Sequence, residues 1–416
     1  MLKKITVAQL KVGMFITSCD ESWLKHSLWR TNFPVKDMAL LQKVQHSGVE
    51  HLWIDVARGA DLSLKADIPA ALVAAPTDEA EPSSQACPAA DPNLATSMAE
   101  ELKFAAALRT RTKEAVRAIF SEVRLGHAVD VGVLLPLVDD VVASVNRNVD
   151  ALVSLARLKS TDEYTYMHSL AVCTLMVALG RRLGFDDTQC REAGMAGMLH
   201  DLGKAAISQD LLNKPGKLSV EEFAVVKQHP SLGYSMLRAG GGLSEGVLDV
   251  CLHHHERVDG KGYPDALSLD QISLLARMGA VCDVYDAVTS DRPYKDRWDA
   301  AEAVAQMASW QGHFDPHVFQ AFVKSVGIYP TGSLVRMTSG KLGIVVEQSV
   351  NRLTAPKVKI FFSARSLIPI KPVVLDLSDP LCRDQIEGRE SPANWKFTGL
   401  DELWAGEFAL SRGPKH

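Results

Sequence analysis

Apolar residues recur at nearly helical spacing through most of the chain, over residues 98–330. One stripe covers Leu102–Val123 and stops at Gly126, and two more follow over Leu134–Val145 and Val149–Leu158. A period near 3.6 residues is typical of helices that bury one face. The same spacing predicts helices over Tyr166–Leu183, Gln189–His200, Val220–Lys227, Ser231–Leu237, Leu243–His253, Leu269–Ser290, Ala300–Trp310 and Pro316–Val326. No β-rich segment interrupts this series, so we expect one all-α domain with three leading helices.

The first 65 residues have a different pattern. Short runs of β-branched and aromatic residues occur at Ile5–Val7, Met14–Thr17 and Glu50–Ile54, as expected of strands. A helical stretch over Asp37–Gln45 begins with a residue that can cap it. We therefore expect a small α+β domain over residues 1–65.

Residues 66–97 have the composition of a flexible linker. Five prolines stand among Ala, Ser, Asp and Glu, with almost no large apolar side chains. Such a segment cannot bury enough apolar surface to fold by itself. The linker separates the N-terminal domain from the helical domain, so the predicted fold class is multidomain and mainly α.

Residues 331–416 return to strand-like alternation and predict a small β unit with a tail. Thr338–Lys341 has the residues of a hairpin turn. The expected strands are Ser333–Met337, Leu342–Glu347, Lys357–Phe361 and Pro372–Asp376. The sequence after Asp379 predicts no further element.

Composition excludes several classes of protein. A net charge of −5 provides no basic surface, so neither nucleic acid nor an anionic membrane is an expected partner. The seven cysteines form no Cys-x-x-Cys pair, which favours a reducing, cytoplasmic setting. Gln9 and Lys11 interrupt the N-terminal apolar run too early for a signal peptide. The longest apolar stretch, Ser169–Gly180, is too short to span a bilayer.

The candidate site is a series of histidines and aspartates on the predicted helices. His200 and Asp201 together offer an imidazole nitrogen and a carboxylate oxygen to a divalent cation, and Lys204 follows one helical turn later. Taken singly, each residue also has an ordinary structural explanation, such as a packed histidine or a helix-end charge. Seven donors on separate helices instead favour two cations that share a carboxylate. The donors are His168, His200, Asp201, His229, His254, His255 and Asp283, with His253 and Asp286 nearby.

The types of donor atom also limit which metal the site is expected to bind. Imidazole and carboxylate without thiolate indicate iron or manganese rather than structural zinc. Beside the triple histidine, Glu256–Pro264 forms a loop with two glycines and a proline, and it presents Tyr263. A plain interhelical turn would explain the glycines alone. A tyrosine next to the metals can stack on a purine or donate a hydrogen bond.

Four segments in order resemble the signature of the HD-GYP domain, a metal-dependent phosphohydrolase that cleaves the second messenger cyclic di-GMP. The segments are His200–Lys204, His254–Glu256, Asp259–Pro264 and Ser290–Lys295. The resemblance covers about residues 150–330. Residues 1–60 resemble, more weakly, a small domain of unknown function often found ahead of HD-GYP domains.

The resemblance implies a role for each donor. His168, His200, Asp201 and Asp283 would form the basic HD site, and Asp201 would bridge to a second metal held by His229, His254 and His255. Lys204, Arg292 and Lys295 match positions that contact substrate phosphates. A hydroxide between the metals would attack phosphorus and give pGpG or GMP. Asp201 and Lys204 are thus the expected catalytic residues, and Tyr263 joins Lys204, Arg292 and Lys295 as a substrate-binding residue.

Three questions stay open at this point. Some family members hold a third metal through a glutamate one turn before the first histidine, but Tyr164 stands there and Glu163 faces elsewhere, so two metals are expected. Besides a cyclic di-GMP phosphodiesterase, two alternatives are open. One is an HD phosphohydrolase that acts on another nucleotide, and the other is a non-catalytic receptor for cyclic di-GMP. Protein partners can bind through the Gly262–Pro264 loop or the N-terminal domain, and the leading helices can alternatively form a dimer.

Overall fold

The computed structural model divides the chain into two compact units, Met1–Gln85 and Ala86–His416. The structure describes residues 2–19, 33–35, 38, 41–42, 51–55, 96–127, 130–158, 164–290, 298–349, 352–395 and 397–409. Its architecture confirms the predicted fold class, a helical bundle with a small sheet in the N-terminal unit and a small C-terminal sheet. The predicted linker lies outside the described residues except for positions 96–97.

The N-terminal unit contains a four-stranded antiparallel sheet in the order β1-β4-β2-β3. Ile5, Ile16 and Ile54 from its strands are buried together with Met14, which explains the short apolar runs in the sequence. Of the helix predicted here, only residues 38, 41 and 42 are described, and they are helical. The strands are β1 (Leu2–Thr6), β2 (Phe15–Cys19), β3 (Phe33–Pro34) and β4 (His51–Asp55).

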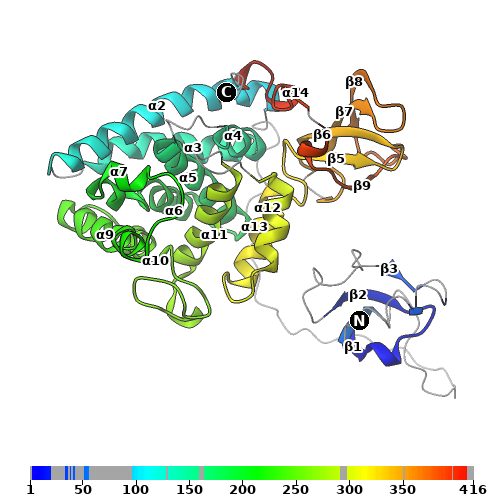
Figure 1. Cartoon of the computed structure of the whole chain (residues 1–416), viewed down its shortest axis with the longest axis horizontal. Helices are drawn as coiled ribbons and strands as arrows, with labels where there is room; N and C mark the ends of the chain where they lie inside the picture. Colours follow the sequence, from blue (N-terminus) through cyan, green and yellow to red (C-terminus); the bar gives the residue numbers. More distant parts are fainter. Residues whose placement is uncertain are drawn as a thin grey trace, which may run out of the picture. The chain divides into compact units, whose positions relative to one another are not determined.

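The second unit is built on a bundle in which the long helix α2 lies along one side (Figure 1). The predicted helices occur in the predicted order, most of them within a few residues at each end. The helices are α2 (Met98–Arg124), α3 (Leu135–Arg147), α4 (Val149–Ala156), α5 (Tyr164–Arg182), α6 (Asp187–Leu199), α7 (Gln209–Leu212), α8 (Val220–Val226), α9 (His229–Gly240), α10 (Glu245–His253), α11 (Leu274–Thr289), α12 (Ala300–Ser309) and α13 (Pro316–Val326), with 3₁₀ turns η3 (Val131–Leu134), η5 (Leu202–Ala206) and η6 (Leu269–Gln271). The short helix α7 was not predicted, and the helix predicted over Leu269–Ser290 is divided into the 3₁₀ turn η6 and α11. In the described part of the chain, no helix is long and apolar enough to cross a membrane.

Two glycines allow the helices that carry the candidate ligands to approach closely. A Cβ on Gly197 of α6 would lie 2.8 Å from the backbone of Cys173 in α5. A Cβ on Gly203 would lie only 1.9 Å from the carbonyl oxygen of His229, at the start of α9. Because no side chain fits at either position, these contacts bring α6 and η5 directly against α5 and α9. Gly203 of the His-Asp-Leu-Gly-Lys segment is therefore a packing residue.

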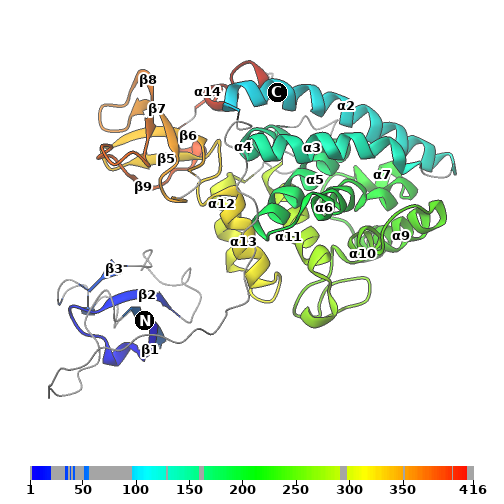
Figure 2. The same cartoon turned by 180° about the vertical axis from the view of Figure 1, so that it is seen from behind.

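The C-terminal sheet is antiparallel, in the order β8-β7-β6-β5-β9. It lies at the end of the bundle occupied by α12 and α13, away from α9 and α10 (Figure 2). The Gln348 N–H donates to buried Asp150 of α4 at 2.7 Å, which joins sheet and bundle. The predicted hairpin joins β5 to β6, whereas β9 and α14 were not predicted. The elements are β5 (Leu334–Met337), β6 (Lys341–Glu347), β7 (Lys357–Ser363), β8 (Ile368–Asp376), β9 (Ile386–Arg389), η7 (Pro392–Asn394), α14 (Glu402–Ala405) and η8 (Gly406–Phe408).

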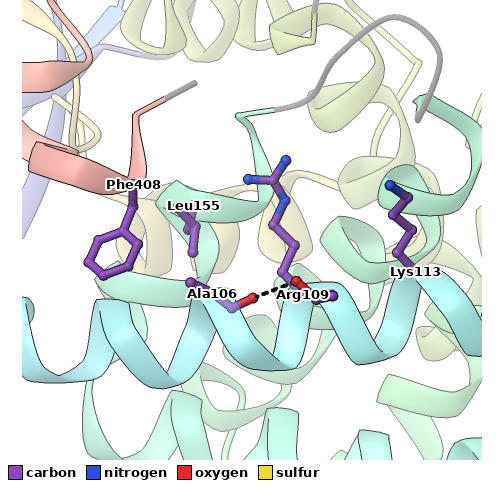
Figure 3. Close-up of a pocket in the computed structure, with 6 residues that line it drawn as sticks. Ala106, Arg109, Lys113, Leu155 and Phe408 are labelled. Carbon is purple, nitrogen blue, oxygen red and sulfur yellow. Dashed lines mark hydrogen bonds between the residues drawn. The ribbon is translucent and has the colours of Figure 1, made fainter. Parts of the chain in front are cut away.

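A cavity of about 200 Å³ lies between α2, α4 and the C-terminal segment. Arg109 and Lys113 of α2 rise beside it, and Leu155 and Phe408 complete its apolar wall (Figure 3). None of the predicted ligand residues lines this cavity.

Candidate metal centre

The bundle brings the seven predicted donors into two adjoining clusters. In each cluster the potential ligand atoms lie within 4.8 Å of one another. One cluster contains His168, His200 and Asp283, and the other contains Asp201, His229, His254 and His255. The donors come from α5, α6 and its C-terminal turn, α9, α10 and α11, so five parts of the chain meet at one point.

Asp201 lies between the clusters and directs one carboxylate oxygen to each. Its Oδ2 is 3.4 Å from Nε2 of His168 and 3.4 Å from Nε2 of His200. Its Oδ1 is 3.3 Å from Nε2 of His229 and 3.8 Å from Nε2 of His254. A carboxylate in this position can bind two cations at once.

Asp283 and His255 complete the two clusters. Oδ1 of Asp283 lies 3.0 Å from Nε2 of His168. Its Oδ2 lies 3.7 Å from Nδ1 of His255. Asp283 therefore faces both clusters as well.

Backbone carbonyls set the orientation of three imidazoles. Nδ1 of His200 donates to the Gly197 carbonyl at 2.8 Å, and Nδ1 of His229 donates to the Val226 carbonyl at 2.8 Å. Nδ1 of His254 donates to the carbonyls of Val250 and Cys251 at 3.0 and 3.1 Å. Because a carbonyl only accepts, Nδ1 of each ring carries a proton, and Nε2 is the nitrogen that points into the centre.

The Nε2 atoms that point into the centre are placed to bind a cation. Nε2 of His229 lies 3.3 Å from Nε2 of His254, so the two ring nitrogens that do not face a carbonyl face each other. Oδ1 of Asp201 is buried and accepts no hydrogen bond among the described residues. An isolated buried carboxylate oxygen is costly, and a divalent cation relieves this cost while it binds the two ring nitrogens. The residues present therefore fit two metal ions.

The protonation states of His254 and His255 are those expected of metal ligands. Burial, together with the neighbouring His255 and His200, holds the pKa of His254 well below its usual value. Burial likewise lowers the pKa of His255 to about 3. Both rings are thus neutral at pH 7, as metal ligation requires.

In the metal-free chain the pKa of His168 is raised, in contrast to those of His254 and His255. Burial lowers its pKa, but hydrogen bonds with Asp201, Asp283 and Asp286 outweigh burial and raise the pKa to about 10. Nδ1 of His168 is 2.6 Å from Oδ2 of Asp286, which is fully buried one turn after Asp283. Asp286 was noted in the sequence without a role. Its spacing of three residues from Asp283 on a helix was the signal that could have placed it here.

Lys204 and Tyr263 lie at the open side of the centre. Nζ of Lys204 is 2.5 Å from Oδ2 of Asp201. The sequence predicted that these residues share one α-helix, but α6 ends at Leu199 and the pair spans the 3₁₀ turn η5. Three residues per 3₁₀ turn keep the two side chains on one side. The Tyr263 ring stacks on His255 with 4.7 Å between ring centroids.

Some predicted residues lie outside the described part of the chain. These include Arg292 and Lys295, the predicted phosphate contacts, and Glu163. Tyr164 begins α5, but its side chain is not among those described. The expectation of two metals rather than three stays a prediction.

Comparison with known proteins gives matches over both units. Residues 2–133 match a domain of unknown function (DUF3391), and residues 139–318 match the HD domain. The cyclic di-GMP phosphodiesterase PA4108 of Pseudomonas aeruginosa is 53% identical over 407 residues, covering 98% of this chain and 96% of the relative. The response regulator RpfG of Xanthomonas campestris, also a cyclic di-GMP phosphodiesterase, is 39% identical over 41% of this chain and 47% of its own length. A 3'3'-cGAMP-specific phosphodiesterase 2 of Vibrio cholerae is 32% identical over 38% and 31%, respectively.

Proposed function

The chain belongs to the HD-domain cyclic di-GMP phosphodiesterases, as its motifs predicted, and we propose that the two clusters around Asp201 are the site of this hydrolysis. The observation that carries the proposal is the placement of the two carboxylate oxygens of Asp201, one toward each cluster. The reaction is the hydrolysis of a phosphodiester bond of cyclic di-GMP, with pGpG or GMP as the product.

Two divalent cations in these clusters would supply Lewis-acid neutralisation of the phosphodiester charge and activation of a water molecule. Asp201 and Asp283 would hold these cations together with the five histidines. Iron or manganese suits this set, because it combines imidazole and carboxylate without thiolate. The fixed Nδ1 contacts keep the imidazoles aligned without reorganisation when substrate arrives.

Lys204 would bind a phosphate oxygen. Its Nζ already lies against Asp201 at 2.5 Å, and its side chain is 24% exposed, so it reaches both the centre and the substrate. As negative charge develops on the equatorial oxygens, an ammonium at this position stabilises it. Arg292 and Lys295 would hold the second phosphate of the dinucleotide through charge-assisted hydrogen bonds.

The location of the enzyme and its partners beyond the substrate are further parts of the proposal. We propose a cytoplasmic enzyme, since its substrate is an intracellular messenger and the cysteines form no paired motif. The Gly262–Pro264 loop and the N-terminal unit are the surfaces for protein partners. For the assembly of the protein, we propose a homodimer formed through the leading helices.

Turnover of cyclic di-GMP by the purified protein tests the function. The protein is loaded with manganese or, without oxygen, with iron, and the products are separated by chromatography beside Asp201→Ala. We expect pGpG or GMP from the wild type and a loss of at least a hundredfold in the variant. A wild-type protein that carries both metals, binds cyclic di-GMP and leaves it intact would instead be a receptor. Faster cleavage of 3'3'-cGAMP than of cyclic di-GMP would assign the alternative substrate.

A further inference from the structure

Among the described residues of the metal centre, solvent exposure is concentrated at His255 and Lys204. Six of the seven donors have side chains that are at most 8% exposed. His255 and Lys204 are 21% and 24% exposed, respectively. A substrate phosphate must therefore approach over these two residues.

A short series of ring contacts connects His255 to α8. The Tyr263 ring stacks on His255, and its other neighbour is Phe223 of α8, with ring centroids 6.4 Å apart and planes at 80°. Nζ of Lys227 lies 5.3 Å from the centroid of Phe223 and 6.0 Å from that of Tyr263. Phe223 nevertheless remains 46% exposed. An aromatic surface with an adjacent ammonium thus lies beside the exposed part of the centre.

We propose that Phe223 and Lys227 form a guanine-binding subsite for the cyclic dinucleotide. This inference rests on the proposed function of the metal centre. A base is joined to its phosphate through one ribose, so the base next to a phosphate over His255 falls in the neighbourhood of Tyr263 and α8. Aromatic side chains bind bases by stacking, which is insensitive to base identity. Phe223 supplies that contact.

Lys227 adds discrimination between purines. Guanine presents two acceptors, O6 and N7, on one edge, and lysine donates to both. Adenine presents N7 but has an amino donor in place of O6, so an ammonium facing that edge loses one contact and meets another donor. A site that hydrogen-bonds a substrate group rejects the analogue that lacks it. Phe223 should therefore set affinity, and Lys227 should set the preference for guanine.

Two variants and two matched controls test this subsite in the full-length, metal-loaded enzyme. Phe223→Ala removes the stacking surface, and Val225→Ala is its control, because Val225 is 44% exposed on the same helix. Lys227→Met removes the donor and keeps the length of the side chain. Lys217→Met, on the exposed segment before α8, is the control for loss of one positive charge. Each protein is assayed with cyclic di-GMP, with cyclic di-AMP, whose two bases are both adenine, and with methyl p-nitrophenyl phosphate, which contains no purine.

We expect Phe223→Ala to raise KM about tenfold for both dinucleotides, the lower part of the range for one lost stacking contact. Lys227→Met should lower kcat/KM for cyclic di-GMP more than for cyclic di-AMP, which has no guanine to place in the subsite, and so reduce the ratio of the two by about fivefold. Neither variant should change hydrolysis of methyl p-nitrophenyl phosphate, and both controls should match the wild type. Unchanged KM and an unchanged ratio in the two variants would overturn the subsite while the proposed function stands.

Failure of the proposed function gives a different result. If the metal-loaded wild type cleaves neither the dinucleotides nor the purine-free diester, equilibrium binding of cyclic di-GMP replaces turnover as the readout. Weaker binding by Phe223→Ala and Lys227→Met, but not by the controls, would still support the subsite. Equal binding by all five proteins would overturn it.

Discussion

The Nε2 atoms of His229 and His254 face each other at 3.3 Å, although both rings donate through Nδ1 to backbone carbonyls. In neutral rings neither Nε2 carries a proton, so the two lone pairs repel at this distance. A cation between them turns that repulsion into two metal–ligand bonds. The metal-free centre is therefore less stable than the loaded one.

Removal of metal should lower the thermal stability of the helical unit. A ligand that binds only the native state at a hundred times its Kd stabilises it by about 2.7 kcal/mol. We expect chelator-treated protein to unfold at lower temperature, and added manganese to restore the transition, as measured by calorimetry. His317→Ala, at an exposed histidine, should retain this response, whereas His254→Ala should lose most of it. Equal transitions with and without metal would contradict the prediction.

Metal binding should release a proton from His168. The pKa of His168 is raised to about 10 in the metal-free chain, so the ring is protonated at pH 7. A ligand must give up that proton, and the affinity for metal should therefore rise with pH between about 6.5 and 8.5. Calorimetric titration in two buffers with different ionisation enthalpies measures the number of protons released. A release of zero, with pH-independent affinity, would show that His168 is not a ligand.

Asp286 should position His168 rather than bind substrate. Its Oδ2 lies 2.6 Å from Nδ1 of His168, and removal of such a carboxylate partner typically costs 10- to 100-fold in metal affinity or activity. We expect Asp286→Asn to weaken metal binding by about that factor, with little change in KM at saturating metal. Asp270→Asn, at an exposed carboxylate just before α11, is the control. A large rise in KM with unchanged metal affinity would refute the positioning role.

Gly203→Ala should disrupt the centre through packing alone. The added Cβ would lie 1.9 Å from the His229 carbonyl oxygen and 2.5 Å from the Gly233 nitrogen, so η5 and α9 must separate. Overpacking of this kind costs about 1–3 kcal/mol or more of unfolding free energy. Gly388→Ala is the control, because no atom lies within 4 Å of its added Cβ and the change should stay within about 0.5 kcal/mol. Denaturant unfolding of both variants measures the difference.

The sequence predicted the bundle because helical spacing is a local pattern, and it also named the seven side chains that the fold brings together. Helical spacing is visible in every segment, and an isolated aspartate such as Asp283 in an apolar helix signals a partner. Contacts that depend on tertiary packing were not visible. The strand β9 has a weak strand pattern, so its pairing with the predicted strand β5 was missed. The contact between Asp286 and His168 spans 118 positions, and its sequence signal was limited to the place of Asp286 one helical turn after Asp283.

The contacts of the exposed face of α8 were likewise not predictable from the sequence. Phe223 fits the helical pattern like any apolar residue, and only the fold places it beside Tyr263. The spacing of donors also predicted an α-helix through Lys204, whereas the chain tightens to a 3₁₀ turn after His200. Close packing at Gly203 against α9 accompanies that change, and such packing cannot be read from a single sequence.

The bridging role of Asp201 is tested most directly by anomalous diffraction from crystals of the manganese-loaded protein. Two peaks are expected, one between Oδ2 of Asp201 and the His168–His200 pair, and the other between Oδ1 and the His229–His254 pair. A single peak, or two peaks of which only one contacts Asp201, would contradict the account.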